Sequence, residues 1–192
     1  MSPYIYTADN PLLYIDPKGE EYYVNQYGEI RDDWKVWDPE DPSVYQVMDN
    51  NDGTELMFMG KVGGDLYVED LFENILDRNI EFAKGIIDPF TFKSLVNDKG
   101  DWDIKLNKNT IYGIGYEAGS DFHFKNWKMS AEDMGNYHYG ATGLAVPIFN
   151  EWFLLMMAGK NQIDKGRSRP EWQNGILTPF TSPYGDDPVD QL

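Results

Sequence analysis

The sequence predicts an α+β fold, in which a small antiparallel β meander (residues 21–67) leads into a mainly α-helical domain (residues 68–192). Two patterns predict it. Short alternating runs broken by turn residues fill the first part, and apolar residues at three- and four-residue steps begin at Leu71. With 41% hydrophobic and 15% aromatic residues, the 192-residue chain can bury a sizeable core. Intrinsic disorder is therefore not expected.

The predicted meander consists of four short runs with strand-like alternation, separated by Asn, Asp, Gly and Pro residues that favour turns. These runs are Tyr22–Val24, Ile30–Trp37, Val44–Val47 and Glu55–Met59. Their aromatic side chains fit the buried face of a small sheet, or a surface that contacts a ligand.

Helical periodicity begins after the meander. The apolar spacing predicts a helix over Glu69–Lys84 that stops at Gly85. A second helix is predicted to open at Asp88, which would be the N-cap before Pro89 at the first helical position, and to end near Asn97.

The remaining segments are less regular. Residues 105–125 contain three glycines and are expected to be irregular or a hairpin. The run Leu144–Met157 is apolar enough for a buried helix, with Pro147 in its first turn. The proline-containing tail, residues 167–192, is expected to be extended.

Composition excludes several classes of protein. The chain has 16 Lys and Arg against 33 Asp and Glu, a net charge of −17, and no cysteine. Disulfides and Cys-ligated metal sites are therefore impossible, and two His residues argue against a multi-histidine metal centre. No apolar stretch reaches about 18 residues, and no basic segment precedes an apolar run at the N-terminus, so neither a membrane span nor a signal peptide is expected.

The charge is unevenly distributed. Residues 1–100 hold 8 basic and 21 acidic side chains, whereas residues 124–169 hold 6 basic and 4 acidic ones. A uniformly acidic surface would repel nucleic acid, but the second stretch has a net charge of +2. The overall charge therefore does not decide between nucleic acid and other partners.

Trp102, Asp103 and Lys105 form the first group that could carry chemistry. Asp103 and Lys105 lie two residues apart, so they face the same side of an extended segment. Beside an indole ring, such a charged pair can clamp a substrate. It can equally be an ordinary ion pair that covers Trp102.

The second group is the segment Glu132–Gly143, with three glycines, two carboxylates and His138. Glycines let backbone N–H groups approach a ligand closely, and His138 with Asp133 could transfer protons near neutral pH. Ser130 followed by Asp133 also resembles a capping box. The alternative is structural: the glycines allow tight packing and His138 is a buried, hydrogen-bonded ring. Neither a phosphate-binding loop nor a dinucleotide fingerprint is present.

The third group holds Asp186, Asp187 and Asp190 near the end of the chain. Three carboxylates within five residues could bind a hard cation such as Mg²⁺ or Ca²⁺, although no cofactor is required. Alternatively, Asp187 before Pro188 is an ordinary helix start.

Fixed aromatic and proline positions mark the first twenty residues. They are Tyr4, Tyr6, Asn10, Pro11, Leu12, Asp16, Pro17 and Gly19. Their spacing resembles the end of the RHS/YD-repeat core of bacterial polymorphic toxins, after which a variable toxin domain follows. The resemblance implies that residues 1–20 join an RHS core in the same polypeptide. Glu20 replaces the Leu of self-cleaving relatives, so cleavage here is not expected.

A second resemblance covers about Leu71–Leu192. Its positions are Asn79-Ile80 (or Asn74-Ile75), Trp102, Asp103, Lys105, Glu132, Asp133, Gly135, Asn136, Tyr139, Gly140, Gly143, Ala158, Gly159, Gly185, Asp186, Asp187, Pro188, Asp190 and Gln191. In this order they resemble the bacterial polymorphic toxin type 44 domain. That resemblance implies a secreted effector delivered into a competing cell, a cognate immunity protein, and the ribonuclease activity proposed for the family.

Three functions remain open from the sequence. In a metal-independent ribonuclease, His138 and Asp133 would transfer protons, and Lys105 with the glycine-rich backbone would stabilise charge on the phosphate. In a peptidoglycan or other glycan hydrolase acting in the periplasm, Glu132 and Asp103 would be the paired carboxylates. The third possibility is a non-catalytic binding or cargo module. The residues expected to bind the substrate are Asn136, Tyr139, Gly140 and Trp102.

Overall fold

The computed structural model describes residues 21–31, 42–50 and 53–188. The RHS-like motif of residues 1–20, most of the predicted strand Ile30–Trp37, and Asp190 lie outside the described residues. The chain divides into two compact units. The first contains the residues up to Ile75 and Asp103–Met134, and the second contains Leu76–Trp102 and Gly135–Leu192. The predicted limits of residues 21–67 and 68–192 stay a prediction.

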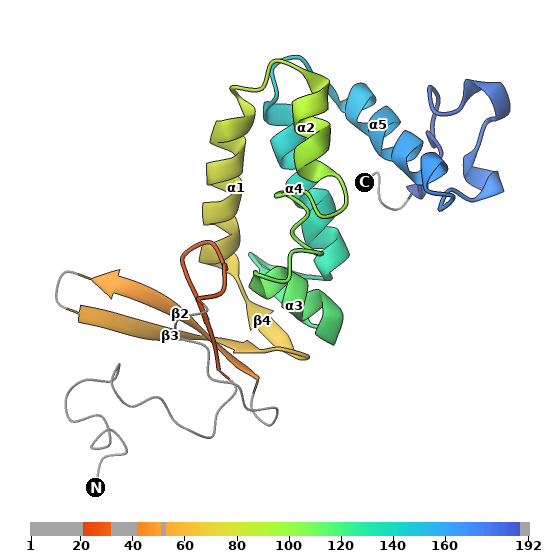
Figure 1. The fold of residues 1–192 in the computed structure, drawn as a ribbon. Coiled ribbons are helices and arrows are strands. Elements are labelled where there is room, and N and C mark those ends of the chain that lie inside the picture. Colours follow the sequence, from red (N-terminus) through yellow and green to blue (C-terminus); the bar gives the residue numbers. More distant parts are fainter. Residues whose placement is uncertain (1–20, 32–41, 51–52, 189–192) are drawn as a thin grey trace, which may run out of the picture. The chain divides into compact units, whose positions relative to one another are not determined.

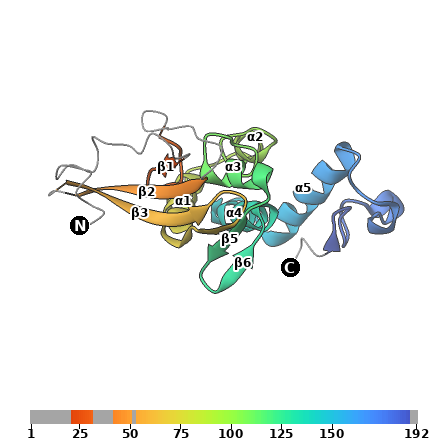
Figure 2. The ribbon, with the colours of Figure 1, turned by 90° about the horizontal axis from the view of Figure 1, so that it is seen from below.

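The first unit is built on a six-stranded mixed sheet whose strands follow the order of the chain (Figure 2). The strands are β1 (Tyr22–Val24), β2 (Ser43–Asn50), β3 (Gly53–Lys61), β4 (Asp65–Tyr67), β5 (Asp121–Phe124) and β6 (Trp127–Met129). Together with five α-helices, this sheet confirms the predicted α+β class.

The prediction of a purely antiparallel meander is wrong at the first strand. β1 pairs with β2 in parallel, with Tyr22 opposite Val44, whereas β2, β3 and β4 are antiparallel neighbours. Parallel pairing requires a long connection, and residues 25–42 provide it between β1 and β2. β4 and β5 are also parallel, and the chain between them carries three helices.

Apolar side chains on one face of this sheet form the core of the first unit. Phe122 and Phe124 of β5 are buried, while the alternate residues Asp121 and His123 are partly exposed. Phe72 meets the Phe124 ring edge to face, with ring centroids 4.9 Å apart. The period-2 alternation of β5 therefore separates a buried apolar face from a polar one.

Helix α1 (Glu69–Ala83) and helix α2 (Pro89–Val96) confirm the two helices expected from the periodicity (Figure 1). Asp88 is the N-cap of α2, as predicted, because its carboxylate accepts hydrogen bonds from the backbone N–H and the hydroxyl of Thr91. These bonds lower the pKa of Asp88.

The expectation of an irregular or hairpin segment over residues 105–125 is wrong in its middle part, where helix α3 spans Ile111–Ala118. A hairpin does begin at β5, which pairs antiparallel with β6. Thr110 caps α3 by accepting a hydrogen bond from the Gly113 N–H, and Gly119 ends it with a φ of 71°. Glycine lowers helix propensity, but a Cβ at Gly115 would collide with the Phe122 ring. The glycine is therefore explained by close packing of the helix on the sheet.

The predicted helix over Leu144–Met157 is wrong in its limits. Helix α4 covers Ala131–Ala145, and helix α5 covers Glu151–Asp164, with Pro147 in the break between them. Proline cannot continue a helix, and Asn150 caps α5 by accepting a hydrogen bond from the Phe153 N–H at 2.9 Å.

The tail beyond α5 is not extended, contrary to expectation. It contains two short 3-10 helices, Pro170–Trp172 and Gly175–Leu177, joined by turns.

The second unit has its own apolar core, and α2 and α4 lie side by side within it (Figure 1). The ring of Phe92 on α2 packs against the rings of Trp102, Tyr139 and Phe149, with centroids 5.2–6.0 Å apart. The buried members of this cluster are Ala83, Ile86, Phe92, Trp102, Val146 and Leu154.

The N-cap of α5 can be tested by mutation. Asn150→Ala is expected to lower the free energy of unfolding by about 1 kcal/mol, since the Phe153 N–H loses its acceptor. Asn136→Ala, at an exposed position inside α4, should be neutral or slightly stabilising because alanine favours helix. Urea denaturation of both variants measures the difference, and equal stabilities would contradict the cap.

Candidate functional site

The glycine-rich segment Glu132–Gly143 is part of helix α4, not a ligand-binding loop. Ser130 and Asp133 form the predicted capping box: the Ser130 N–H donates to Asp133 Oδ2 at 2.8 Å, and the Asp133 N–H donates to Ser130 Oγ at 3.1 Å. Inside a helix, backbone N–H groups donate to carbonyls four residues earlier. Beyond the first turn, the N–H groups of this segment are therefore engaged within the helix.

His138 is buried in the second unit, with 1% of its surface exposed. Its Nε2 lies 2.9 Å from the Asn79 amide nitrogen, and the Trp102 ring packs edge to face against the imidazole. Burial, with a smaller contribution from Arg78, lowers the pKa of His138 to about 4. The imidazole is therefore neutral at pH 7 and shielded from a polymeric substrate, which fits the structural alternative.

The carboxylates predicted to be catalytic, in the ribonuclease or in the glycan hydrolase, are placed as follows. Asp133 bonds to Ser130 in the capping box. Glu132 is exposed, at 62%, and its carboxylate lies 3.5 Å from the Lys105 ammonium. Asp103 is buried, and its backbone carbonyl accepts hydrogen bonds in the turn that follows it. Lys105 therefore pairs with Glu132.

Two of the four residues expected to bind substrate, Trp102 and Tyr139, are too enclosed for that role. Trp102 belongs to the apolar core of the second unit. The Tyr139 hydroxyl donates to the Leu154 carbonyl at 3.0 Å, and burial, with Asp186 contributing, raises the pKa of Tyr139 above its usual range. Gly140 lies in open space on α4. The fourth, Asn136, is exposed on α4 and accessible.

The acidic group near the C-terminus is only partly described. Asp186 is buried, and its Oδ1 accepts a hydrogen bond from the Asp187 N–H at 3.0 Å. In residues 21–31, 42–50 and 53–188, no group of three or more carboxylate or imidazole side chains is placed to hold a metal ion. A cation site that includes Asp190 stays a prediction.

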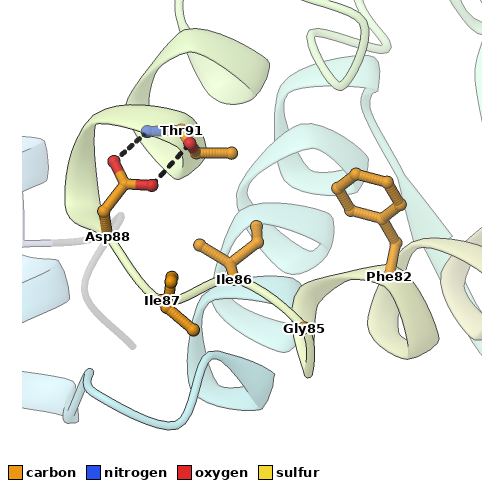
Figure 3. A pocket seen from close by; sticks show the side chains of 6 residues that line it. All are labelled: Phe82, Gly85, Ile86, Ile87, Asp88 and Thr91. Atoms are coloured by element: carbon orange, nitrogen blue, oxygen red, sulfur yellow. Dashed lines mark hydrogen bonds between the residues drawn. The ribbon is translucent and has the colours of Figure 1, made fainter.

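A groove of about 430 Å³ lies at the connection between α1 and α2 (Figure 3). Its lining residues are Phe82, Gly85, Ile86, Ile87, Asp88 and Thr91. Its one carboxylate, Asp88, already bonds to Thr91, as Figure 3 shows. The groove is therefore mainly apolar and offers little for acid–base chemistry.

Sequence reasoning missed a polar network on the sheet of the first unit. The Nε2 atom of His123 on β5 lies 2.9 Å from Oδ1 of Asp65 on β4, and the Tyr67 ring stacks on the imidazole with centroids 4.7 Å apart. The Lys128 ammonium on β6 lies 3.1 Å from Asp65 and 2.9 Å from Asp121. The network joins an imidazole, two carboxylates and an ammonium on the polar face.

The groups of this network stabilise the ionised forms of Asp65 and Lys128. The hydrogen bond from His123, followed by that from Lys128, lowers the pKa of Asp65. The hydrogen bonds to Asp121 and Asp65 raise the pKa of Lys128. At pH 7 the network therefore holds an ionised Asp65 and a charged Lys128 beside an imidazole that is partly exposed.

The alternation in Asp121–Phe124 was the one sequence signal for this site, because it places His123 on the polar side of a strand. The partner Asp65 is 58 residues away, and only strand pairing brings it to His123.

A comparison with protein families finds that the profile of bacterial toxin 44 matches residues 91–192, just over half of the chain. The chain belongs to the bacterial toxin 44 family. This confirms the resemblance to toxin type 44 drawn from the motifs. Comparisons with curated proteins and with solved structures gave no match.

The match to bacterial toxin 44 includes both histidines and Lys128, but not Asp65 or Asn79. The part of this toxin domain that the structure describes contains no helix long and apolar enough to cross a membrane. A toxin domain is consistent with delivery into target cells.

Proposed function

We propose that this bacterial toxin domain is a ribonuclease that acts in the cytoplasm of a target bacterium and transfers protons through His123. The observation that carries this proposal is the exposed His123–Asp65–Lys128 network on the sheet. Membership of the bacterial toxin 44 family supports a role as a toxin, and the network offers groups suited to RNA hydrolysis.

The network contains a base and a cation for this reaction, and the proton for the leaving oxygen would come from solvent water. RNA cleavage through its own 2′-hydroxyl requires a base for that hydroxyl, an acid for the leaving oxygen and positive charge near the phosphate. If the Nε2–H of His123 donates to Asp65, the Nδ1 atom of the same ring is left as the base. Lys128, directly opposite His123 in the sheet, is the cation of the network, and its ammonium would exchange an ion pair with Asp65 or Asp121 for the phosphate.

Accessibility favours His123 over the pair His138 and Asp133. A polymer must reach the reacting group, and His138 is enclosed while His123 is on a partly exposed face. The glycan-hydrolase alternative is less well supported. Its catalytic acid should lie in an apolar pocket that keeps it protonated, whereas Glu132 is exposed beside the Lys105 ammonium.

The biological setting is part of the same proposal. The motif in residues 1–20 supports attachment to an RHS core, and a toxin aimed at bacteria requires a cognate immunity protein in the producing cell. We propose that the domain is secreted as part of such a polypeptide and delivered into a competing cell.

Expression in two compartments of an unprotected host tests the function. The wild type is expected to stop growth and degrade RNA when it stays in the cytoplasm, and His123→Ala is expected to lower RNA cleavage by the purified protein by at least about 100-fold. Lys108→Ala, which removes an exposed cation of the same unit, should leave cleavage unchanged.

Three outcomes would contradict this proposal. Toxicity only after export to the periplasm would indicate a glycan hydrolase, and toxicity in neither compartment would indicate a binding or cargo module. The third outcome is that His123→Ala cleaves RNA as well as the wild type while a well-folded His138→Gln does not cleave it. This would show that His138, and not His123, is the catalytic histidine.

A further inference from the structure

We propose that the segment Lys165–Trp172, in the second unit, binds the backbone and one base of single-stranded RNA. This inference rests on the proposed function, since it takes RNA as the substrate. It assigns the segment a binding role separate from the chemistry at His123.

Positive charge is concentrated in this segment. Lys165, Arg167 and Arg169 place three cations within five residues, in a chain whose net charge is −17. Elsewhere the acidic surface repels a polyanion, so RNA would be drawn to the few places where cations cluster.

Two of the cations share one carboxylate. The Lys165 ammonium lies 2.5 Å from Oδ1 of Asp98, so this carboxylate is already neutralised. The Arg167 guanidinium is 3.8 Å from the other oxygen of Asp98, near the limit of an ion pair, and its side chain is 60% exposed. Arg167 can therefore exchange this weak contact for a phosphate.

Arg169 is held in a different way. Its guanidinium lies over the Trp172 ring, 4.8 Å from the centroid, and it forms no ion pair with the residues that the structure describes. A guanidinium held over an indole keeps N–H groups available, and these can bind a phosphate through two hydrogen bonds.

The backbone of the segment is fixed. The N–H groups of Arg167 and Ser168 both donate to the Gln162 carbonyl, at 2.9 and 3.2 Å. The Gln173 amide donates to the Ser168 carbonyl at 3.3 Å, and the Gly185 N–H donates to the Trp172 carbonyl at 3.1 Å. The two arginines are therefore presented from a defined position, which lowers the entropy lost on binding.

Helix electrostatics alone account for only part of this cluster. Cations near the C-terminus of α5 stabilise the helix, and this explains Lys165. Arg169 lies beyond the last turn and packs on an indole. An arginine and an aromatic ring next to further cations is the combination with which proteins bind single strands, where phosphates meet cations and bases stack on rings.

The test measures RNA binding without cleavage. A labelled single-stranded oligoribonucleotide is titrated against the full chain carrying His123→Ala, over a series of salt concentrations. Adding Arg167→Gln and Arg169→Gln is expected to weaken binding about 10-fold or more at low salt and to reduce the slope of log affinity against log salt by about 1.4. Trp172→Ala should weaken binding by a similar factor, and Trp172→Phe should restore most of it.

The control pair Lys84→Gln and Lys108→Gln removes the same charge at exposed positions outside the segment. It is expected to change the affinity less than two-fold. Equal losses in both double variants, unchanged binding by the arginine variant, or no RNA binding by the parent would each overturn this inference. RNA binding that depends on the arginines, in a chain that never cleaves RNA, would uphold it and overturn the proposed function instead.

Discussion

Gly159→Ala is expected to destabilise the second unit by about 3 kcal/mol, the upper range for overpacking of a core. Gly159 is buried on α5, and an added Cβ would lie inside contact distance of the Tyr184 backbone carbonyl. That carbonyl cannot move away easily, because the next residue, Gly185, is packed closely against the Ile163 side chain. Urea denaturation of the purified variant measures the loss.

Gly140→Ala is the matched control. It makes the same substitution in helix α4, where nothing lies within 4 Å of the added Cβ. Because alanine has the higher helix propensity, this variant is expected to gain up to about 1 kcal/mol. A Gly159→Ala variant as stable as the wild type would show that the tail does not pack on α5.

The stability of the chain is expected to fall as the pH is lowered from about 6.5 to 4, with His138 as a main cause. The native state holds the pKa of His138 near 4, whereas the unfolded chain has the ordinary value of 6.5. Above pH 6.5 the imidazole is neutral in both states. Between the two values only the unfolded state takes up the proton, so unfolding becomes more favourable by about 3 kcal/mol in total.

The comparison of wild type with His138→Gln isolates this effect from the titration of the carboxylates. The wild type should lose about 3 kcal/mol more than the variant over this pH range, as measured by urea denaturation at each pH. The NMR shift of the His138 ring protons should show no titration above pH 5. A ring that titrates near pH 6.5 would mean that it is open to solvent, and would restore His138 as a catalytic candidate.

Local patterns predicted the elements that depend on neighbours in the chain. The apolar spacing located α1, and Asp88 and Ser130 marked helix starts that the structure confirms. Each of these signals acts over three or four residues. The break at Pro147 was misjudged because the flanking residues are apolar enough to hide it.

The candidate site was predicted less well than the helices. The glycines, carboxylates and histidine of the segment Glu132–Gly143 suggested a ligand-binding loop. Helix packing explains at least one of these glycines, because Gly143 packs closely against Leu154. His138 looked reactive by type and proved buried, with an amide as its partner. Residue type cannot reveal burial, because burial depends on which helix packs across from it.

By itself, the sequence determined the α+β class, the positions of α1 and α2, and membership of the bacterial toxin 44 family. These rest on local spacing and on motif order, which the chain carries directly. Only the tertiary structure decided that His138 is enclosed and that His123 meets Asp65. Those facts depend on strand pairing and helix packing between residues about sixty positions apart, and the register of such contacts is fixed only when the core assembles.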